Sequence, residues 1–171
     1  MRKKVVIVDT SILVVLLQVP GFVDAGEEHL TYEQIKERIT NYKGEGAIML
    51  LTVACVIETG NHIAQIKDGD LRRNKVNEFA SFLEDVVNNS NGWMMYYSEK
   101  DLWTKEEIVK LVNMWRANGI YKLSMGDASI LKVANQLKQI FEVVVFTGDS
   151  QLSSLSLMPV TPIYAPNKKR N

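Results

Sequence analysis

The chain has few of the residues on which several kinds of catalytic site depend. It contains one cysteine and two histidines among 171 residues. A single cysteine excludes an internal disulfide and a zinc site built from several thiolates, and it suits a reducing compartment. His29 lies in a polar stretch and His62 in a helical one, and the chain has no Gly-x-Ser-x-Gly turn, which argues against a Ser-His-Asp triad. A glycine-rich phosphate loop is also missing.

The chain also lacks an excess of charge and a long apolar run. Its 20 basic and 20 acidic residues give a net charge of zero, so no overall field attracts nucleic acid. Local basic groups remain at Arg72–Lys75 and Lys168–Arg170, and such groups are typical of a solvated surface. Arg2–Lys4 precedes an apolar run as in a signal peptide, but Asp9–Ser11 interrupts that run and Leu13–Val19 is too short to span a bilayer. We therefore expect a cytoplasmic protein without a membrane segment.

What the chain does contain is an alternation of short apolar runs and amphipathic segments. Hydrophobic residues make up 46% and charged residues 23%, as in an ordinary globular domain. Val5–Val8 and Val143–Phe146 are β-branched or aromatic runs without polar alternation, which is typical of strands buried on both faces. Further strands are expected at Ala47–Leu51, Trp93–Tyr97 and Val160–Tyr164. Helical spacing predicts helices over residues 12–18, 32–42, 53–66, 76–86, 104–118, 124–137 and 151–155.

This alternation predicts a three-layer α/β/α fold with a central, mainly parallel sheet. We expect residues 1–166 to form a single domain, followed by a basic tail at 167–171. The stretch from about 20 to 46 reads as an insertion, with a loop to about Glu28 and then a helix. Such an insertion would form a lid, a substrate platform or a dimer face.

Two acidic residues directly follow buried strands. Asp9 comes after the first strand, and Asp149 follows Thr147-Gly148 after the late one. Parallel strands joined by right-handed crossovers present their carboxyl ends at one edge of the sheet, where ligands bind in open α/β folds. We therefore expect Asp9 and Asp149 to be neighbours. The alternative is that Asp9, Thr10 or Ser11 merely caps the next helix.

Two further acids lie at helical positions. Glu58 follows the apolar stretch Ala54–Ile57, where an unpaired carboxylate is costly to bury, and the nearest basic partner is His62, one turn on. Asp127 begins a helix, where the alternative is simple stabilisation by the helix dipole. Asn61, about one turn beyond Glu58, would reach the same edge or remain a surface amide.

Carboxylates brought together raise one another's pKa unless a cation neutralises them. Mg²⁺ and Mn²⁺ prefer carboxylate and water oxygens, and such a site activates a bound water and stabilises a phosphoryl group attacked in line. We therefore expect one or two Mg²⁺ or Mn²⁺ ions at a site formed by Asp9, Glu58, Asp127 and Asp149.

The order of these motifs resembles that of PIN-domain ribonucleases, a family that includes many bacterial and archaeal toxin nucleases. The resemblance rests on Val8–Ser11, Glu58, Met125–Ala128 and Phe146–Asp149, which span nearly the whole chain. It implies metal-dependent endonucleolytic hydrolysis of RNA, with the four acids as the metal pocket. Asp9 and Asp127 would be the most direct ligands, Glu58 the next, and Asp149 would act through water.

The same resemblance implies that the hydroxyls of Ser11 and Thr147 support the pocket through hydrogen bonds. RNA is the implied substrate, and an antitoxin protein and a second copy of the chain are the further partners it suggests. A non-catalytic RNA- or protein-binding module on the same fold is the main alternative, although loss of an acid would favour it and all four are present.

Two other interpretations are weighed against the residues. A phosphotransfer enzyme with Asp9 as nucleophile is disfavoured, because the dehalogenase type needs an acid at the position of Ser11, and the receiver type needs an acid pair and a late lysine. The spacing of the aromatic residues favours core packing over stacking on bases. These aromatic residues are Trp93, Tyr96, Tyr97, Trp103 and Trp115.

Overall fold

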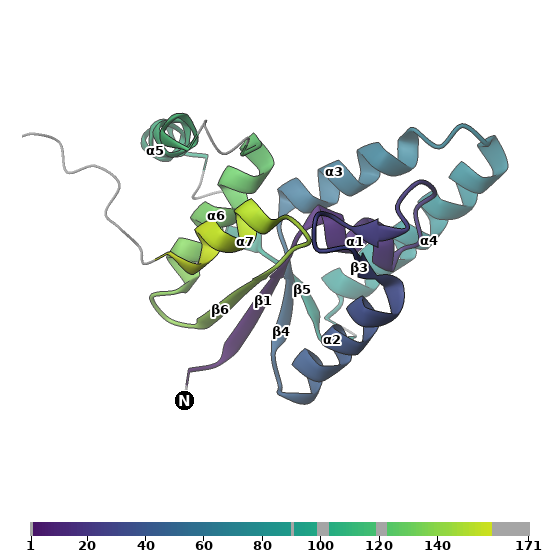
Figure 1. Ribbon diagram of the computed structural model, residues 1–171, viewed down its shortest axis with the longest axis horizontal. Coiled ribbons are helices and arrows are strands. Elements are labelled where there is room, and N and C mark those ends of the chain that lie inside the picture. The colour runs from purple at the N-terminus through teal and green to yellow at the C-terminus, as the bar shows by residue number, and fades with distance from the viewer. Residues whose placement is uncertain (1, 90, 99–102, 119–122, 159–171) are drawn as a thin grey trace, which may run out of the picture.

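The computed structural model describes residues 2–89, 91–98, 103–118 and 123–158 (Figure 1). The strands of its main sheet are β1 (Lys4–Val8), β4 (Ile48–Leu51), β5 (Trp93–Met95) and β6 (Glu142–Phe146), all parallel and in the order β5-β4-β1-β6. The helices are α1 (Thr10–Leu16), α2 (Tyr32–Gly44), α3 (Val53–Ala64), α4 (Gly69–Val87), α5 (Lys105–Ala117), α6 (Met125–Leu137) and α7 (Ser150–Leu157). Two short strands, β2 (Asp24–Ala25) and β3 (Leu30–Thr31), pair antiparallel.

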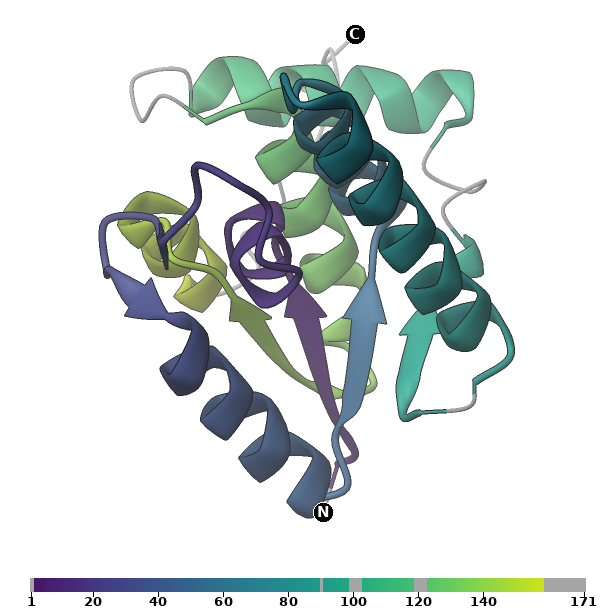
Figure 2. The same cartoon turned by 90° about the vertical axis from the view of Figure 1, so that its right-hand side faces the viewer.

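Helices cover both faces of the main sheet (Figure 2). Val6 and Val8 belong to a core shared with α1, α2, α3 and α4, whereas Val5 and Ile7 belong to a second core shared with α5, α6 and α7. Successive side chains of a strand point to opposite faces, so a strand buried on both faces has no polar alternation. The predicted three-layer α/β/α fold is therefore confirmed.

The sheet register places the ends of three strands at one level. Val8 pairs with Leu51 of β4 and Phe146 of β6, and the Asp9 amide donates to the Phe146 carbonyl at 3.0 Å. The chain moves outward from β1 to β4 and β5, and then returns to place β6 on the other side of β1. Open α/β sheets bind ligands at such a change of direction, here the crevice between the ends of β1 and β6.

The segment expected to be a loop up to about Glu28 is instead partly a β-hairpin made of β2 and β3. Gly26 and His29 have positive φ values of 58° and 49°, which turn the chain back on itself. Thr31 then caps α2 in a capping box with Gln34. The expected strand at 93–97 is shorter, ending at Met95, and the expected strand at 160–164 and the basic tail lie outside the described residues.

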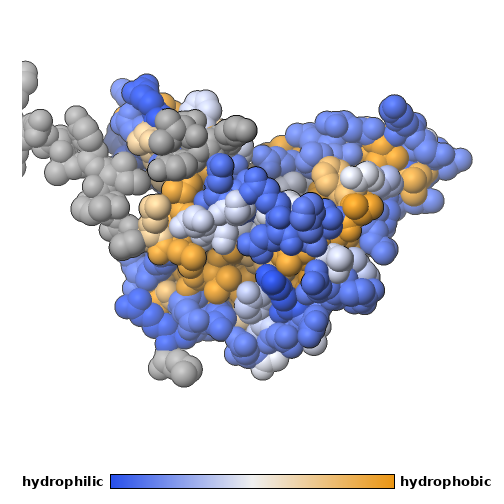
Figure 3. Space-filling view, viewed as in Figure 1, coloured by the Kyte–Doolittle hydropathy of each residue, from blue (hydrophilic) through white to orange (hydrophobic). Residues whose placement is uncertain are grey.

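Hydrophilic residues cover most of the face seen in Figure 3, and apolar residues are visible in separate patches between them. Among the described helices, none is both long enough and apolar enough to cross a membrane. Cys55 is fully buried in the core, and burial raises the pKa of its thiol. A thiol in that environment is a packing group rather than a nucleophile.

Candidate active site

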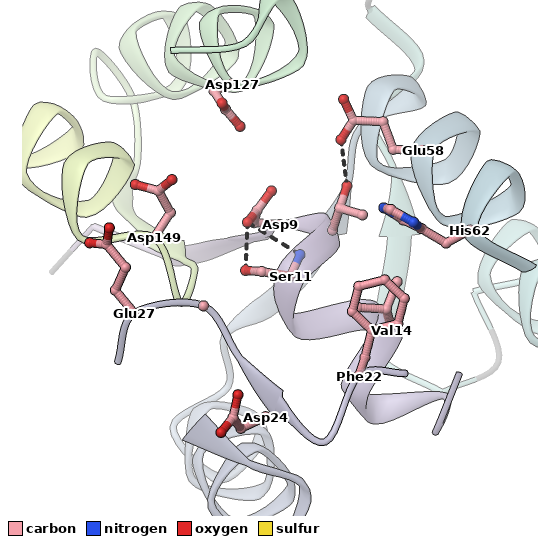
Figure 4. A pocket seen from close by; sticks show the side chains of 12 residues that line it. Asp9, Ser11, Val14, Phe22, Asp24, Glu27, Glu58, His62, Asp127 and Asp149 are labelled. Atoms are coloured by element: carbon pink, nitrogen blue, oxygen red, sulfur yellow. Dashed lines mark hydrogen bonds between the residues drawn. The ribbon is translucent and has the colours of Figure 1, made fainter. Parts of the chain in front are cut away.

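The four predicted acids line one cavity of about 330 Å³ at the carboxyl edge of the sheet (Figure 4). They come from the end of β1, from α3, from α6 and from the turn after β6. Among the described residues that line the cavity there is neither a lysine nor an arginine, but there are six carboxylates: Asp9, Asp24, Glu27, Glu58, Asp127 and Asp149. The lining of the cavity is therefore strongly acidic, and carboxylate oxygens are the ligands that hard cations prefer.

Asp9 occupies the centre of this arrangement and is held firmly (Figure 4). Its Oδ2 accepts hydrogen bonds from Ser11 Oγ at 2.7 Å, from Thr147 Oγ1 at 2.9 Å and from the Ser11 amide at 3.3 Å. Both hydroxyls thus bind the same oxygen, and Oδ1 accepts from neither of them. Asp9 also caps α1, so the capping alternative and the pocket expectation both hold for this residue.

The two hydroxyls join the ends of β1 and β6. Ser11 Oγ accepts from the Gly148 amide at 3.0 Å, and Thr147 Oγ1 accepts from the Asp149 amide at 3.0 Å. Each hydroxyl therefore donates to Asp9 and accepts from the turn that carries Asp149. Hydrogen bonds of this kind fix the orientation of the Asp9 carboxylate, and they place the hydroxyls of Ser11 and Thr147 directly beside it.

The electrostatic environment of Asp9 is unfavourable to its charged form. Burial raises the pKa of Asp9, hydrogen bonds from Ser11 and Thr147 lower it in part, and the charge of Asp127 raises it again. The direction is upward, because desolvation is the largest cause. A cation bound in the cavity would offset the free-energy cost of burying this charge beside Asp127.

Glu58 reaches the cavity from α3, and its carboxylate lies between α1 and α6. Its Oε2 accepts a hydrogen bond from Thr10 Oγ1 at 2.8 Å. Its Oε1 lies so close to Gly126 that a Cβ at that position would overlap it. The glycine of the Met125–Ala128 motif therefore makes room for the carboxylate of Glu58.

Asp127 and Asp149 each cap a helix as well as lining the cavity. Asp127 Oδ2 accepts from the Ser124 amide at 2.9 Å within a capping box at the start of α6. Asp149 Oδ1 accepts from the amides of Gln151 and Leu152, both at 2.8 Å, at the start of α7. The caps engage one oxygen of each carboxylate, so a second oxygen that no cap uses remains on each.

The β2–β3 hairpin forms a further wall of the cavity, which the sequence did not reveal. A Cβ on Gly26 would overlap the Gly148 backbone, and a Cβ on Gly148 would overlap the Ala25 carbonyl, so the two segments meet backbone to backbone. Ser150 Oγ donates to Glu27 Oε2, and the Glu28 amide donates to the Gly148 carbonyl. This contact brings Asp24 and Glu27 to the cavity. No periodic pattern could have found it.

His62 takes the place on α3 that was considered for Asn61. Asn61 is exposed and is not among the residues that line the cavity, whereas His62 lines it and packs against Phe22 with ring centroids 4.8 Å apart. The only sequence signal for His62 was its spacing of four residues from Glu58, which places both on nearly the same side of a helix.

The carboxylates that line the cavity are the oxygen donors that could hold a hard cation. In residues 2–158, apart from the gaps given above, no three His, Cys, Asp or Glu side chains are grouped closely enough to hold one ion. Mg²⁺ keeps several waters and uses one or two carboxylates in most protein sites. Hard carboxylate oxygens spaced around a cavity of about 330 Å³ suit such binding, partly through water.

The other predicted functional groups lie away from the cavity. Arg72 Nη1 donates to the Ile66 carbonyl and Lys75 Nζ to the Leu17 carbonyl, so both side chains have structural partners. Among the aromatic residues, the core expectation is confirmed for Trp93. It is wrong for Tyr97, Trp103 and Trp115, which are 61%, 53% and 39% exposed. None of these described residues lines the cavity.

Comparison with models of known protein families found no match, and comparison with curated proteins found none either. The resemblance to PIN-domain ribonucleases therefore stays a prediction from the order of the motifs. What the chain can do must be inferred from the geometry of its own cavity.

Proposed function

We propose that the protein is a metal-dependent endoribonuclease that hydrolyses phosphodiester bonds of RNA at this cavity. The observation that carries the proposal is the convergence of four carboxylates, from segments far apart in the chain, on one cavity. No described residue of its lining is a lysine or an arginine. An anionic phosphodiester is repelled by such a cavity until cations bind there. The carboxylates and the substrate therefore require the same ions.

The residues have distinct parts in this proposal. Asp9 and Asp127 would hold Mg²⁺ or Mn²⁺ directly, with Glu58 next and Asp149 through water. When bound, the ion supplies a water of lowered pKa and neutralises charge that develops on the phosphoryl oxygens. Ser11 and Thr147 would keep Asp9 oriented through their hydrogen bonds to its Oδ2.

A second candidate is a non-catalytic RNA- or protein-binding module on the same fold. It is favoured by the spacing of the carboxylates, since no three ligating side chains among the described residues enclose one ion. The hydrogen bonds to each acid would then serve the fold alone. Action as the toxin of a toxin–antitoxin pair in the cytoplasm, with an antitoxin or a second copy as partner, extends the first proposal and rests on the motif resemblance.

Calorimetric titration of Mn²⁺ into the wild type, Asp127→Asn and Asp70→Asn tests the proposal. Asparagine at 127 retains an oxygen that can accept from the Ser124 amide, so the cap survives while the charge is lost. Asp70 is an exposed acid of α4 and provides the matched control. We expect binding by the wild type and the control, strong weakening in Asp127→Asn, and cleavage of a panel of single-stranded RNAs that follows the same order.

Two results would contradict the proposal. Cleavage of RNA by a clean Asp127→Asn preparation would separate the activity from the cavity. Failure of the folded wild type to bind Mn²⁺, both alone and with a short oligoribonucleotide, would favour the binding module.

A further inference from the structure

The cavity has an aromatic wall beside its acids (Figure 4). Phe22 and His62 both line it, with ring centroids 4.8 Å apart and ring planes at 68°. Val14 of α1 completes the apolar lining next to them. Figure 4 shows Asp127 and Asp149 on the side away from these rings, with Asp9 between them and the rings. One cavity thus offers an acidic part and an aromatic part.

The two rings are fixed relative to the acids by the backbone that carries them. His62 lies on α3 one turn after Glu58, and Phe22 precedes Asp24 on the segment that leads into the hairpin. The Phe22 amide donates to the Val19 carbonyl at 3.2 Å, and its side chain packs partly against the core. His62 is therefore held by a helix, whereas Phe22 lies on the loop between α1 and β2 and is held by its backbone hydrogen bond and its packing.

We propose that Phe22 and His62 form a subsite that stacks one unpaired nucleobase of the RNA while the neighbouring phosphodiester lies at the acids. This inference rests on the proposed ribonuclease function and adds to it a subsite that binds one base. Aromatic faces accept any base by stacking, but only a base that is free of a duplex can enter a pocket. A cavity of about 330 Å³ is at the small end of the usual range for ligand sites.

The test measures binding of two fluorescein-labelled probes by fluorescence anisotropy in Ca²⁺, which also takes carboxylate oxygens and replaces the Mn²⁺ of the cleavage assay, with probe integrity checked on a gel. One probe is a 12-nucleotide oligouridylate, and the other is a ribose-phosphate chain of the same length without bases. The variants are Phe22→Leu, which keeps apolar volume but loses the ring, and His62→Gln, which keeps a polar side chain but loses the ring. Val23→Ala is the matched control, since Val23 is 85% exposed on the same segment.

We expect the wild type and Val23→Ala to bind the oligouridylate about 5-fold to 150-fold more tightly than the baseless probe, the range measured for stacking of one base on one aromatic side chain. Phe22→Leu and His62→Gln should lose most of this preference and retain the affinity for the baseless probe. The affinity for the baseless probe separates a base contact from a structural role, because a disturbed fold would lower the affinity for both probes.

Each other outcome is decisive. An unchanged preference in a Phe22→Leu protein that melts like the wild type would overturn the subsite, and if that variant does not fold, His62→Gln decides. Equal binding of the two probes by the wild type would overturn the subsite and leave the proposed function standing. Binding of neither probe by the wild type would contradict the proposed function and the subsite together.

Discussion

Replacing Asp9 by asparagine should stabilise the metal-free protein while it destroys the cation site. Asp9 is 5% exposed, and burial together with the charge of Asp127 raises the pKa of its carboxyl. Each unit by which folding raises the pKa of an acid costs about 1.4 kcal/mol at neutral pH. Asparagine is as good an N-cap and can accept the hydrogen bonds of Ser11 and Thr147. We expect the variant to have the higher Tm in the absence of metal, and each 1 kcal/mol gained would raise the Tm by about 2–4 °C for a chain of this length.

Thermal unfolding followed by circular dichroism, in EDTA and in Mn²⁺, measures this effect. Because folding raises the pKa of Asp9, its charged carboxylate destabilises the fold most at pH values above the raised pKa. The advantage of Asp9→Asn should therefore shrink as the pH falls through the raised pKa and be lost below the ordinary value of 3.8. At 100 times Kd, Mn²⁺ should stabilise the wild type by about 2.7 kcal/mol and leave the variant almost unchanged. The Tm of Asp9→Asn should therefore be higher than that of the wild type in EDTA and lower in Mn²⁺.

Glu37→Gln, which removes a charge from the exposed face of α2, should melt within about 0.5 kcal/mol of the wild type in both conditions. A lower Tm for Asp9→Asn in EDTA would refute the idea that the buried charge is a cost. Equal stabilisation of both proteins by Mn²⁺ would place the cation elsewhere.

Three further substitutions test contacts around the site. Glu107→Gln should lower the free energy of unfolding by about 1–2 kcal/mol in urea, because Glu107 Oε2 lies 2.7 Å from Nζ of Lys132, whose side chain is only 10% exposed. Hydrogen bonds from neighbouring lysines hold the pKa of Glu107 below its ordinary value of 4.5, so the loss should vanish as the pH falls below that value and through the lowered one. Gly126→Ala should change stability by less than about 1 kcal/mol but displace the Glu58 carboxylate, which calorimetry would record as weaker Mn²⁺ binding. Gly148→Ala should cost more than about 2 kcal/mol, because its Cβ meets rigid hairpin backbone, and limited proteolysis should then cut the hairpin faster.

Simple outcomes would contradict these three expectations. A Glu107→Gln protein as stable as the wild type at pH 7 would mean that the tie between α5 and α6 is dispensable. Unaltered Mn²⁺ affinity in Gly126→Ala would remove Glu58 from the ligand set. Wild-type stability of Gly148→Ala would mean that the hairpin does not need its close contact with the turn after β6.

The alternation of strands and helices, and the burial of the strands on both faces, could be predicted from the sequence because both depend on local patterns. An unalternating strand such as Val5–Val8 must have apolar neighbours on both faces, and helices joined to parallel strands supply them. The position of Asp9 and Asp149 at the ends of such strands then follows from the shared direction of the strands. The helix caps are equally local, because a carboxylate or hydroxyl at the first residue satisfies amides within three residues of it.

Which residues line the cavity besides the predicted acids is determined by the tertiary structure alone. Asn61 and His62 lie about 60° and 40° from Glu58 on opposite sides around the helix axis, so spacing permits either to face the site. The packing of α3 against Phe22 selects His62. The contact of Gly26 with Gly148 joins backbone segments more than a hundred residues apart. Such contacts depend on how whole elements pack and not on any local period, so the acids were predictable from the sequence and the cavity around them was not.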